Sequence, residues 1–134
     1  MWDCDAEGAK EDQAAKGCVM PALNYRAVFV TPVECGWKRQ TIRRVRKRPI
    51  RAGDTLYHYT GMRTARCRLL REDPCLCVLP IRITDGEVAI DGRPLGYGER
   101  RLLAARDGFP SIDCFLAFFR GQYGLPFEGE IIYW

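Results

Sequence analysis

Lys38 and Thr41 are the residues whose types and spacing best suit covalent chemistry. A threonine hydroxyl attacks a carbonyl efficiently only when a base beside it takes its proton. A lysine becomes such a base when its pKa falls, and the nearby cations Arg39 and Arg43 favour that fall because they oppose a further positive charge. The pair therefore predicts a nucleophile and its activator. An acid such as Asp107 would act on the lysine in the opposite direction.

The three-residue spacing between Lys38 and Thr41 places a condition on the backbone. On a regular strand their side chains point to opposite faces. The two side chains converge only if Lys38 lies in the turn after Gly36, or on a bulge. The alternative is an ordinary basic strand over residues 38–43 that presents phosphate-binding side chains outward. Catalysis and binding without chemistry therefore both stay open.

Positive charge is concentrated in the middle of the chain. Residues 38–71 contain twelve Lys or Arg and one acid, Asp54, whereas the whole chain has a net charge of only +4. Such focusing indicates an anionic partner. The alternative is a solvated loop over residues 44–52 whose charge aids solubility. We expect phosphate contacts, which supply affinity but little sequence specificity. The predicted contact residues are Arg39, Arg43, Arg44, Arg46, Lys47 and Arg48.

Residues 57–64, Tyr-His-Tyr-Thr-Gly-Met-Arg-Thr, form a second candidate binding segment. Tyr59 is suited to stacking on a base, and Arg63 to bonding a base edge or a phosphate. The alternative is that Tyr57 and Tyr59, which share one face of a strand, pack in the core.

Composition excludes several classes of protein. The chain has 134 residues, 47% of them hydrophobic, which suits one compact domain, and it contains no apolar run long enough to span a membrane. The N-terminus lacks the basic and apolar regions of a secretory signal. The seven cysteines are irregularly spaced without a C-x-x-C pair, so we expect no metal site, no cofactor and a reducing, cytoplasmic location.

The pattern of residues predicts many short strands followed by two helices. We expect residues 1–19 to be an extension or tail and residues 20–134 to form the domain. The expected elements are strands over residues 25–30, 38–43, 55–60, 65–70, 75–83, 87–90 and 130–134, a single helical turn at 31–34, and helices over 97–106 and 111–120. Asp85-Gly86 is typical of a type I′ hairpin turn. The fold class is α+β, a small, partly closed mixed β-barrel of about five or six strands with about two or three helices.

Three separated motifs occur in the order found in the ASCH family. The stretch Gly36-Trp37-Lys38-Arg39-Gln40-Thr41-Ile42-Arg43 resembles the family pattern Gly-x-Lys-x-x-Thr-x-Arg. Gly53-Asp54 then opens a strand, and Asp107-Gly108-Phe109 precedes a helix that begins at Ser111. The resemblance covers residues 22–134. It implies a fold similar to PUA domains.

The resemblance also implies a function. Some similar proteins are amidohydrolases acting on N4-acetylcytidine, and carrying over their catalytic set by position implicates Lys38, Thr41 and Asp107. The amidohydrolases have Glu where this chain has Asp107, a side chain shorter by about 1.5 Å. Other members are linked to RNA binding or RNA cleavage. We therefore expect RNA or a nucleoside-like ligand, with binding, amide hydrolysis and ribonuclease activity as the alternatives, and neither a membrane nor an obligate protein partner.

Overall fold

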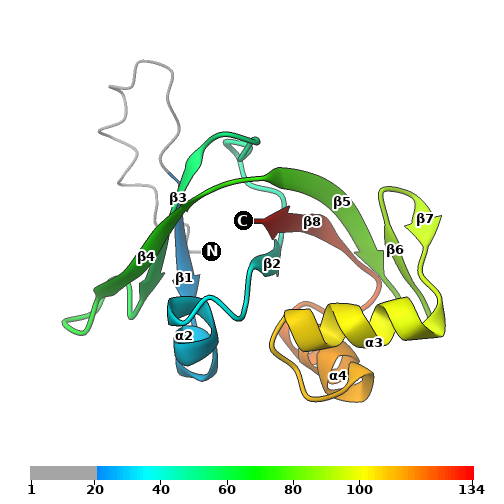
Figure 1. The fold of residues 1–134 in the computed structure, drawn as a ribbon. Coiled ribbons are helices and arrows are strands. Elements are labelled where there is room, and N and C mark those ends of the chain that lie inside the picture. The colour runs from blue at the N-terminus through cyan, green and yellow to red at the C-terminus, as the bar shows by residue number, and fades with distance from the viewer. Residues whose placement is uncertain (1–20) are drawn as a thin grey trace. The chain divides into compact units, whose positions relative to one another are not determined.

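The computed structural model describes residues 21–134, which form an α+β structure (Figure 1). The described residues contain three helices, α2 (Ala27–Glu34), α3 (Tyr97–Arg106) and α4 (Ile112–Gln122). They also contain eight strands: β1 (Ala22–Tyr25), β2 (Gln40–Arg43), β3 (Thr55–Thr60), β4 (Arg68–Pro74), β5 (Cys77–Ile83), β6 (Val88–Ile90), β7 (Arg93–Pro94) and β8 (Phe127–Tyr133). No helix in this part of the chain is long and apolar enough to cross a membrane. The expected extension over residues 1–19 lies outside the described residues.

The described chain divides into two compact units, and each has its own sheet. The first unit contains residues 21–37 and 46–77 with Trp134, and the second contains residues 38–45 and 78–133. The strand order is β1-β3-β4 in the first sheet and β2-β8-β5-β6-β7 in the second. The described residues therefore contain eight strands in two open sheets. The predicted arrangement, about five or six strands in one partly closed barrel, is wrong in this respect. Composition and alternation predict which segments are strands, but they do not determine which strands become neighbours.

In the first unit, β3 is the central strand. It pairs in parallel with β1 and antiparallel with β4, with a register irregularity between His58 and Tyr59. Leu56 and His58 are fully buried on one face of β3. Helix α2 packs against this sheet, and its buried residues are Phe29 and Val33.

The strand predicted over residues 25–30 is wrong, because β1 ends at Tyr25 and α2 begins at Ala27. The short apolar run Ala-Val-Phe-Val fits a strand and a helix equally well by composition. Phe29 and Val33, four residues apart, lie on one face of a helix and are both buried. This spacing is the signal for the helix. The single helical turn predicted over residues 31–34 is the end of that longer helix.

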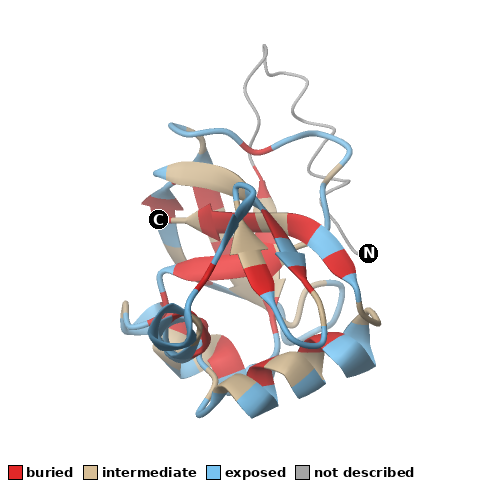
Figure 2. Cartoon of the chain, turned by 90° about the vertical axis from the view of Figure 1, so that its right-hand side faces the viewer, coloured by how far each residue is buried: buried red, intermediate tan, exposed pale blue. Residues whose placement is uncertain are grey.

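The second unit is built around an apolar cluster that joins its sheet to α3 and α4. Strand residues such as Ile83 and Ile131 pack with Leu103 of α3 and with Phe115 and Phe119 of α4. Figure 2 shows most buried residues along the strands, while the helices carry both buried and exposed residues. This cluster fixes α3, and with it the end of α3 that contributes to the candidate site.

Both C-terminal helices agree with the predictions, α3 at the same bounds and α4 beginning one residue later and ending two residues later than expected. The Ser111 hydroxyl caps α4 by accepting a hydrogen bond from the backbone N–H of Cys114 at 3.1 Å. Phe115 and Phe119 are buried, and Ile112 is half-buried against the same cluster. The apolar spacing and the cap residue together are sufficient to predict this helix.

The type I′ turn forms at a different Asp-Gly pair from the one predicted. Asp91 and Gly92 both have positive φ, 54° and 79°, and form the two-residue loop between β6 and β7. The earlier pair, Asp85-Gly86, lies in a four-residue loop between Ile83 and Val88, and neither residue has the positive φ that a type I′ turn requires. Both sequences permit the turn, and the strand register decides where it forms.

Other strand positions agree with the predictions to within a few residues. Strand β3 has the predicted bounds, β2 begins at Gln40 instead of residue 38, and β4 and β5 begin two or three residues later than expected. Residues 44–52 contain neither helix nor strand, as predicted for the basic loop. Ile50 is its buried exception, at 2% exposure, and anchors the loop to the first unit.

Candidate functional site

Lys38 lies outside the regular strand, which is the condition for its convergence with other site residues. The backbone turns at Gly36, where φ is 84°, and β2 begins only at Gln40. The alternation rule for strands therefore does not apply between Lys38 and Thr41. Lys38 lies in the connection after α2, which meets the first of the two conditions for its convergence with Thr41.

Lys38 and Asp107 form a buried ion pair. Nζ of Lys38 lies 3.1 Å from Oδ1 of Asp107, and the two side chains are 3% and 5% exposed. Asp107 occupies the C-cap of α3, where its backbone N–H bonds the Leu103 carbonyl oxygen at 3.0 Å. The apolar packing of α3 thus holds the carboxylate against a residue 69 positions earlier in the sequence. Two members of the predicted catalytic set are therefore in direct contact.

Gln40 also belongs to this site and is absent from the predicted set. Its Nε2 donates to Oδ1 of Asp107 and to the backbone oxygen of Leu103, each at 3.4 Å. Gln40 shares its strand face with Ile42, which lies in the apolar core. A polar residue in phase with a core residue is the signal that could have identified it, because a buried amide requires a partner.

Burial governs the electrostatics of the Lys38–Asp107 pair. Loss of solvent lowers the pKa of Lys38, and this effect outweighs the attraction of Asp107, which raises it. Burial likewise raises the pKa of Asp107 against the opposing effects of Lys38, Gln40 and Arg43. Both shifts favour uncharged forms, so Lys38 loses its proton more readily than an exposed lysine does. This is the property required of a lysine that acts as a base.

Thr41 is hydrogen-bonded to Arg43. The Thr41 hydroxyl oxygen accepts a hydrogen bond from Nε of Arg43 at 3.0 Å, and Thr41 is 5% exposed. Burial dominates the pKa shifts of Lys38 and Asp107, and the positive charge of Arg43 makes a smaller contribution that lowers the pKa of both groups. The direct approach of Thr41 to Lys38 stays a prediction.

The close approach of β2 and β8 helps to position Arg43. Arg43 pairs with Glu130 in the antiparallel ladder, and Gly129 is buried next to that pair. A Cβ added at Gly129 would overlap the carbonyl oxygen of Arg43 and the ring of Phe127. Glycine is required here because the two strands leave no space for a side chain.

The other predicted binding residues divide between the two units. Arg39 and Arg44 are exposed residues of the second unit, and the guanidinium of Arg44 lies 4.9 Å from the ring centroid of Tyr123. The remainder belong to the first unit, and these are Arg46, Lys47, Arg48, Tyr59 and Arg63. Whether both groups contact one ligand stays a prediction.

A second buried polar cluster lies in the first unit. The His58 ring has the hydroxyl of Tyr25 3.0 Å from Nδ1 and Oδ2 of Asp73 3.2 Å from Nε2. Arg71 donates twice to Asp73, at 2.7 and 2.8 Å. Trp134 packs on the imidazole at 4.3 Å between ring centroids. His58 is fully buried at the centre of this cluster.

A recess of about 580 Å³ lies on the second unit between α3 and α4. Its lining includes Tyr97, Arg101, Leu102, Ile112 and Asp113, and none of the predicted site residues. Among residues 21–134, no three His, Cys, Asp or Glu side chains are grouped to hold a metal ion.

No family model matches this chain, and neither the curated proteins nor the solved structures contain a significant match.

Proposed function

We propose that this protein binds RNA or a nucleoside-like ligand at the Lys38–Asp107 site and hydrolyses an amide on a modified base. The observation that supports it most is the buried lysine, 3% exposed, whose pKa burial lowers. A buried ionisable pair supplies a base, and the proposal adds the Thr41 hydroxyl as the nucleophile that approaches it. The ASCH-like motif order and the proposed PUA-like fold point to N4-acetylcytidine as the substrate.

The proposed reaction uses Lys38 as the base and Thr41 as the nucleophile. Neutral Lys38 takes the proton of the Thr41 hydroxyl as its oxygen bonds to the acetyl carbonyl carbon. The C–N bond then breaks, and Lys38 returns the proton to the amine of cytidine. Water hydrolyses the acetyl ester on Thr41 and releases acetate, which restores the hydroxyl. Two proton transfers are thus assigned to one buried amine.

Three other residues support this assignment. Asp107 and Gln40 hold the amine of Lys38 and the carboxylate in fixed positions through the contacts described above. Arg43 donates to the Thr41 oxygen and carries the positive charge that stabilises a developing oxyanion. Because the cysteines are irregularly spaced, we propose a reducing, cytoplasmic location. RNA is the proposed macromolecular partner.

Binding without chemistry is the second candidate, and two contacts favour it. The Thr41 oxygen already accepts a hydrogen bond from Arg43 at 3.0 Å, and Lys38 donates to Asp107. In this alternative the same side chains bind the polar edge of a base or a phosphate and no bond is broken. The two candidates differ in whether acetate is released.

The test is acetate release from N4-acetylcytidine and from an RNA that contains it. We expect turnover by the wild-type protein, and its loss in Thr41→Ala and Lys38→Met. Because the two residues act as a unit, the double variant should be almost no slower than either single variant. Thr41→Ser keeps the hydroxyl and should keep activity. Arg82→Ala, an exposed residue paired with Glu128, is the matched control.

Two outcomes would change the assignment. No turnover on either substrate, with binding retained, would favour the binding function. Turnover that survives Thr41→Ala would mean that water attacks directly. The variant Asp107→Glu adds one methylene and restores the acid of the amidohydrolases that this chain resembles. If the length of the acid limits the rate, Asp107→Glu raises it.

A further inference from the structure

Tyr57 and Tyr59 lie together on the outer face of the first unit's sheet. They alternate along β3 with Leu56 and His58, which are fully buried on the opposite face. Both tyrosines are partly exposed. The alternative that the two pack in the core therefore does not hold, and the rings are available on a sheet surface.

The strand register identifies the neighbours of these rings. Tyr57 lies between Ala22 of β1 and Glu72 of β4, and Tyr59 lies between Asn24 and Leu69. Leu69 is 41% exposed. The pKa of Tyr59 is raised, first by partial burial and then by Cys67, Glu72 and Tyr57, which agrees with these groups sharing one face. The face is thus aromatic and apolar, with Glu72 as its acid.

A hydrogen-bonded turn borders this face. Residues 61–67 connect β3 to β4, and the Thr64 hydroxyl donates to the Gly61 oxygen at 2.6 Å while accepting from the Arg66 N–H at 3.0 Å. The backbone N–H of Met62 donates to Oδ1 of Asn24 at 3.0 Å, which fastens the turn to β1. The turn therefore holds a defined shape beside the tyrosines.

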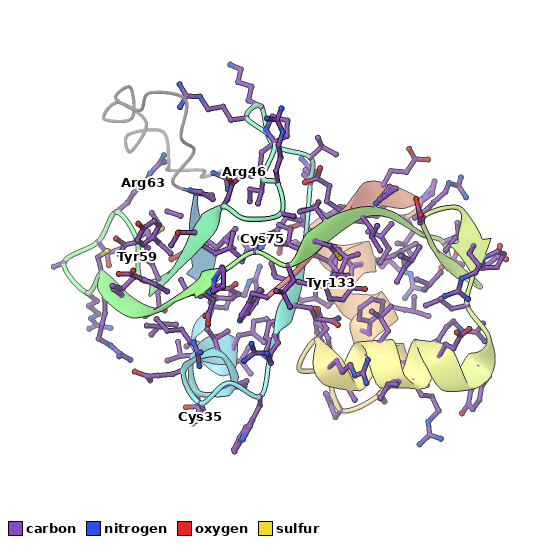
Figure 3. All side chains as sticks on the ribbon, turned by 45° about the horizontal axis from the view of Figure 1, so that its top comes forward. Cys35, Arg46, Tyr59, Arg63, Cys75 and Tyr133 are labelled. Carbon is purple, nitrogen blue, oxygen red and sulfur yellow. The ribbon has the colours of Figure 1, made fainter. Side chains whose placement is uncertain are left out.

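The turn presents two arginines to solvent. Arg63 and Arg66 are both exposed, and Arg63 has a positive φ of 69°. A left-handed conformation is unfavourable for a residue with a long side chain, and such strain is typical of functional positions. On the open edge of β1, Nη1 of Arg46 donates to the Ala22 oxygen at 3.4 Å. Figure 3 shows Arg46, Tyr59 and Arg63 towards the same end of the unit, away from Cys35.

We propose that this surface binds single-stranded nucleic acid. We call it the tyrosine face, and it comprises Tyr57, Tyr59, Arg63 and Arg66. Bases stack on the two rings, and the arginines of the turn bind the phosphates between them. Charge complementarity supports this partner, because the described residues of the first unit contain nine Lys or Arg against four Asp or Glu.

The geometry favours an extended strand over a duplex or a free nucleoside. Residues two apart on a strand are separated by about 6.6 Å, roughly twice the stacking distance of bases in a duplex. Two bases on these rings are therefore unstacked from each other, as they are in a single strand. A free nucleoside fills one ring only. This inference goes beyond the proposed function and does not depend on any reaction at Lys38.

The experiment measures the binding of a fluorescein-labelled decauridine by fluorescence anisotropy. Tyr59→Ala should weaken binding about 5- to 100-fold, the loss typical of one stacked base, whereas Tyr59→Phe keeps the ring and should bind as the wild type does. Arg63→Gly removes the guanidinium without opposing the positive φ and should weaken binding. Tyr97→Ala, which removes a tyrosine of α3 that is 64% exposed, is the aromatic control. Circular dichroism confirms that each variant is folded.

A strand of ten abasic sites separates stacking from charge, because it keeps the phosphates and lacks the bases. Weak binding of that strand supports the proposal, and equal binding overturns it. If the face instead joins two copies of this chain, Tyr59→Ala would change the sedimentation of the protein and leave decauridine binding unaltered, which also overturns it. Decauridine carries no acetyl group, so its binding is measured independently of acetate release. Failure of the hydrolase proposal is therefore distinguishable from failure of this one.

Discussion

Nζ of Lys38 donates to two atoms of Asp107, the backbone oxygen at 2.8 Å and the carboxylate Oδ1 at 3.1 Å. The two contacts attach the lysine both to the end of α3 and to the acid that caps it. The protonation state of Lys38 therefore depends on the position of α3, because any displacement of this helix removes the hydrogen-bond partners of the buried amine. The same contacts determine how the pair contributes to stability.

We expect the pair to be strongly coupled in the free energy of unfolding. Lys38→Met or Asp107→Leu alone leaves a buried partner uncompensated, and each should cost about 3–5 kcal/mol. The double variant Lys38→Met/Asp107→Leu removes both groups and should cost much less than the sum. Urea unfolding of the four proteins measures this coupling. Additive losses would show that the ion pair has no cooperative role.

The stability of the protein should depend on pH through this pair at both ends of the scale. Above its ordinary pKa of 3.8, Asp107 retains a proton in the folded protein that the unfolded chain releases, so stability falls as the pH rises through the folded pKa. Below 10.5, Lys38 lacks a proton in the folded protein that the unfolded chain retains, so stability rises as the pH approaches 10.5. Urea unfolding at a series of pH values gives the free energy of unfolding as a function of pH. This dependence should be flatter for the double variant than for the wild type, both above pH 3.8 and below pH 10.5. Parallel curves for the double variant and the wild type would contradict these shifts.

Gly129 should tolerate no side chain, because β8 passes so close to the Arg43 backbone. Gly129→Ala forces the strands apart or distorts the Phe127 ring, and overpacking of this kind costs about 1–3 kcal/mol. Gly121→Ala is the matched control, because that glycine lies in α4 with nothing within 4 Å of an added Cβ. It should stabilise the protein by about 0.5–1 kcal/mol. Equal effects of the two substitutions, measured by thermal unfolding, would contradict the close approach.

Local signals in the sequence are sufficient to predict a secondary-structure element when that element's own residues determine its conformation. Ser111 with the spacing of Phe115 and Phe119 predicts α4, because cap and apolar stripe agree. The prediction for the segment that forms α2 is wrong because its apolar run is too short to distinguish the periodicity of a helix from that of a strand. Only Val33, four residues after Phe29, indicates a helix. The type I′ geometry is assigned to Asp85-Gly86 instead of Asp91-Gly92 because the two Asp-Gly pairs offer the same chemistry, and the register of β6 decides between them.

The candidate site is predictable only in part, for a related reason. Lys38 and Asp107 are 69 residues apart, so no local spacing brings them together, and the expectation that they share a site rests on a motif resemblance alone. Gln40 is missed because its place among core residues is visible only once the face of β2 is known. Thr41 is assigned to Lys38 by chemistry, whereas the side chain that donates to its hydroxyl oxygen is the arginine two residues later.

Binding of single-stranded RNA should weaken steeply with salt, because each phosphate contact releases condensed counterions. Substituting alanine for four cations of the basic loop should flatten the plot of log K against log salt by roughly 0.7 for each phosphate that is no longer neutralised. These four are Arg44, Arg46, Lys47 and Arg48. A control with the same change in net charge uses four cations outside the loop and should lower affinity with little change in slope. These are Arg82, Arg93, Arg101 and Arg120. Fluorescence anisotropy from low to moderate salt measures both slopes, and an unchanged slope in the first variant would show that the loop does not contact phosphates.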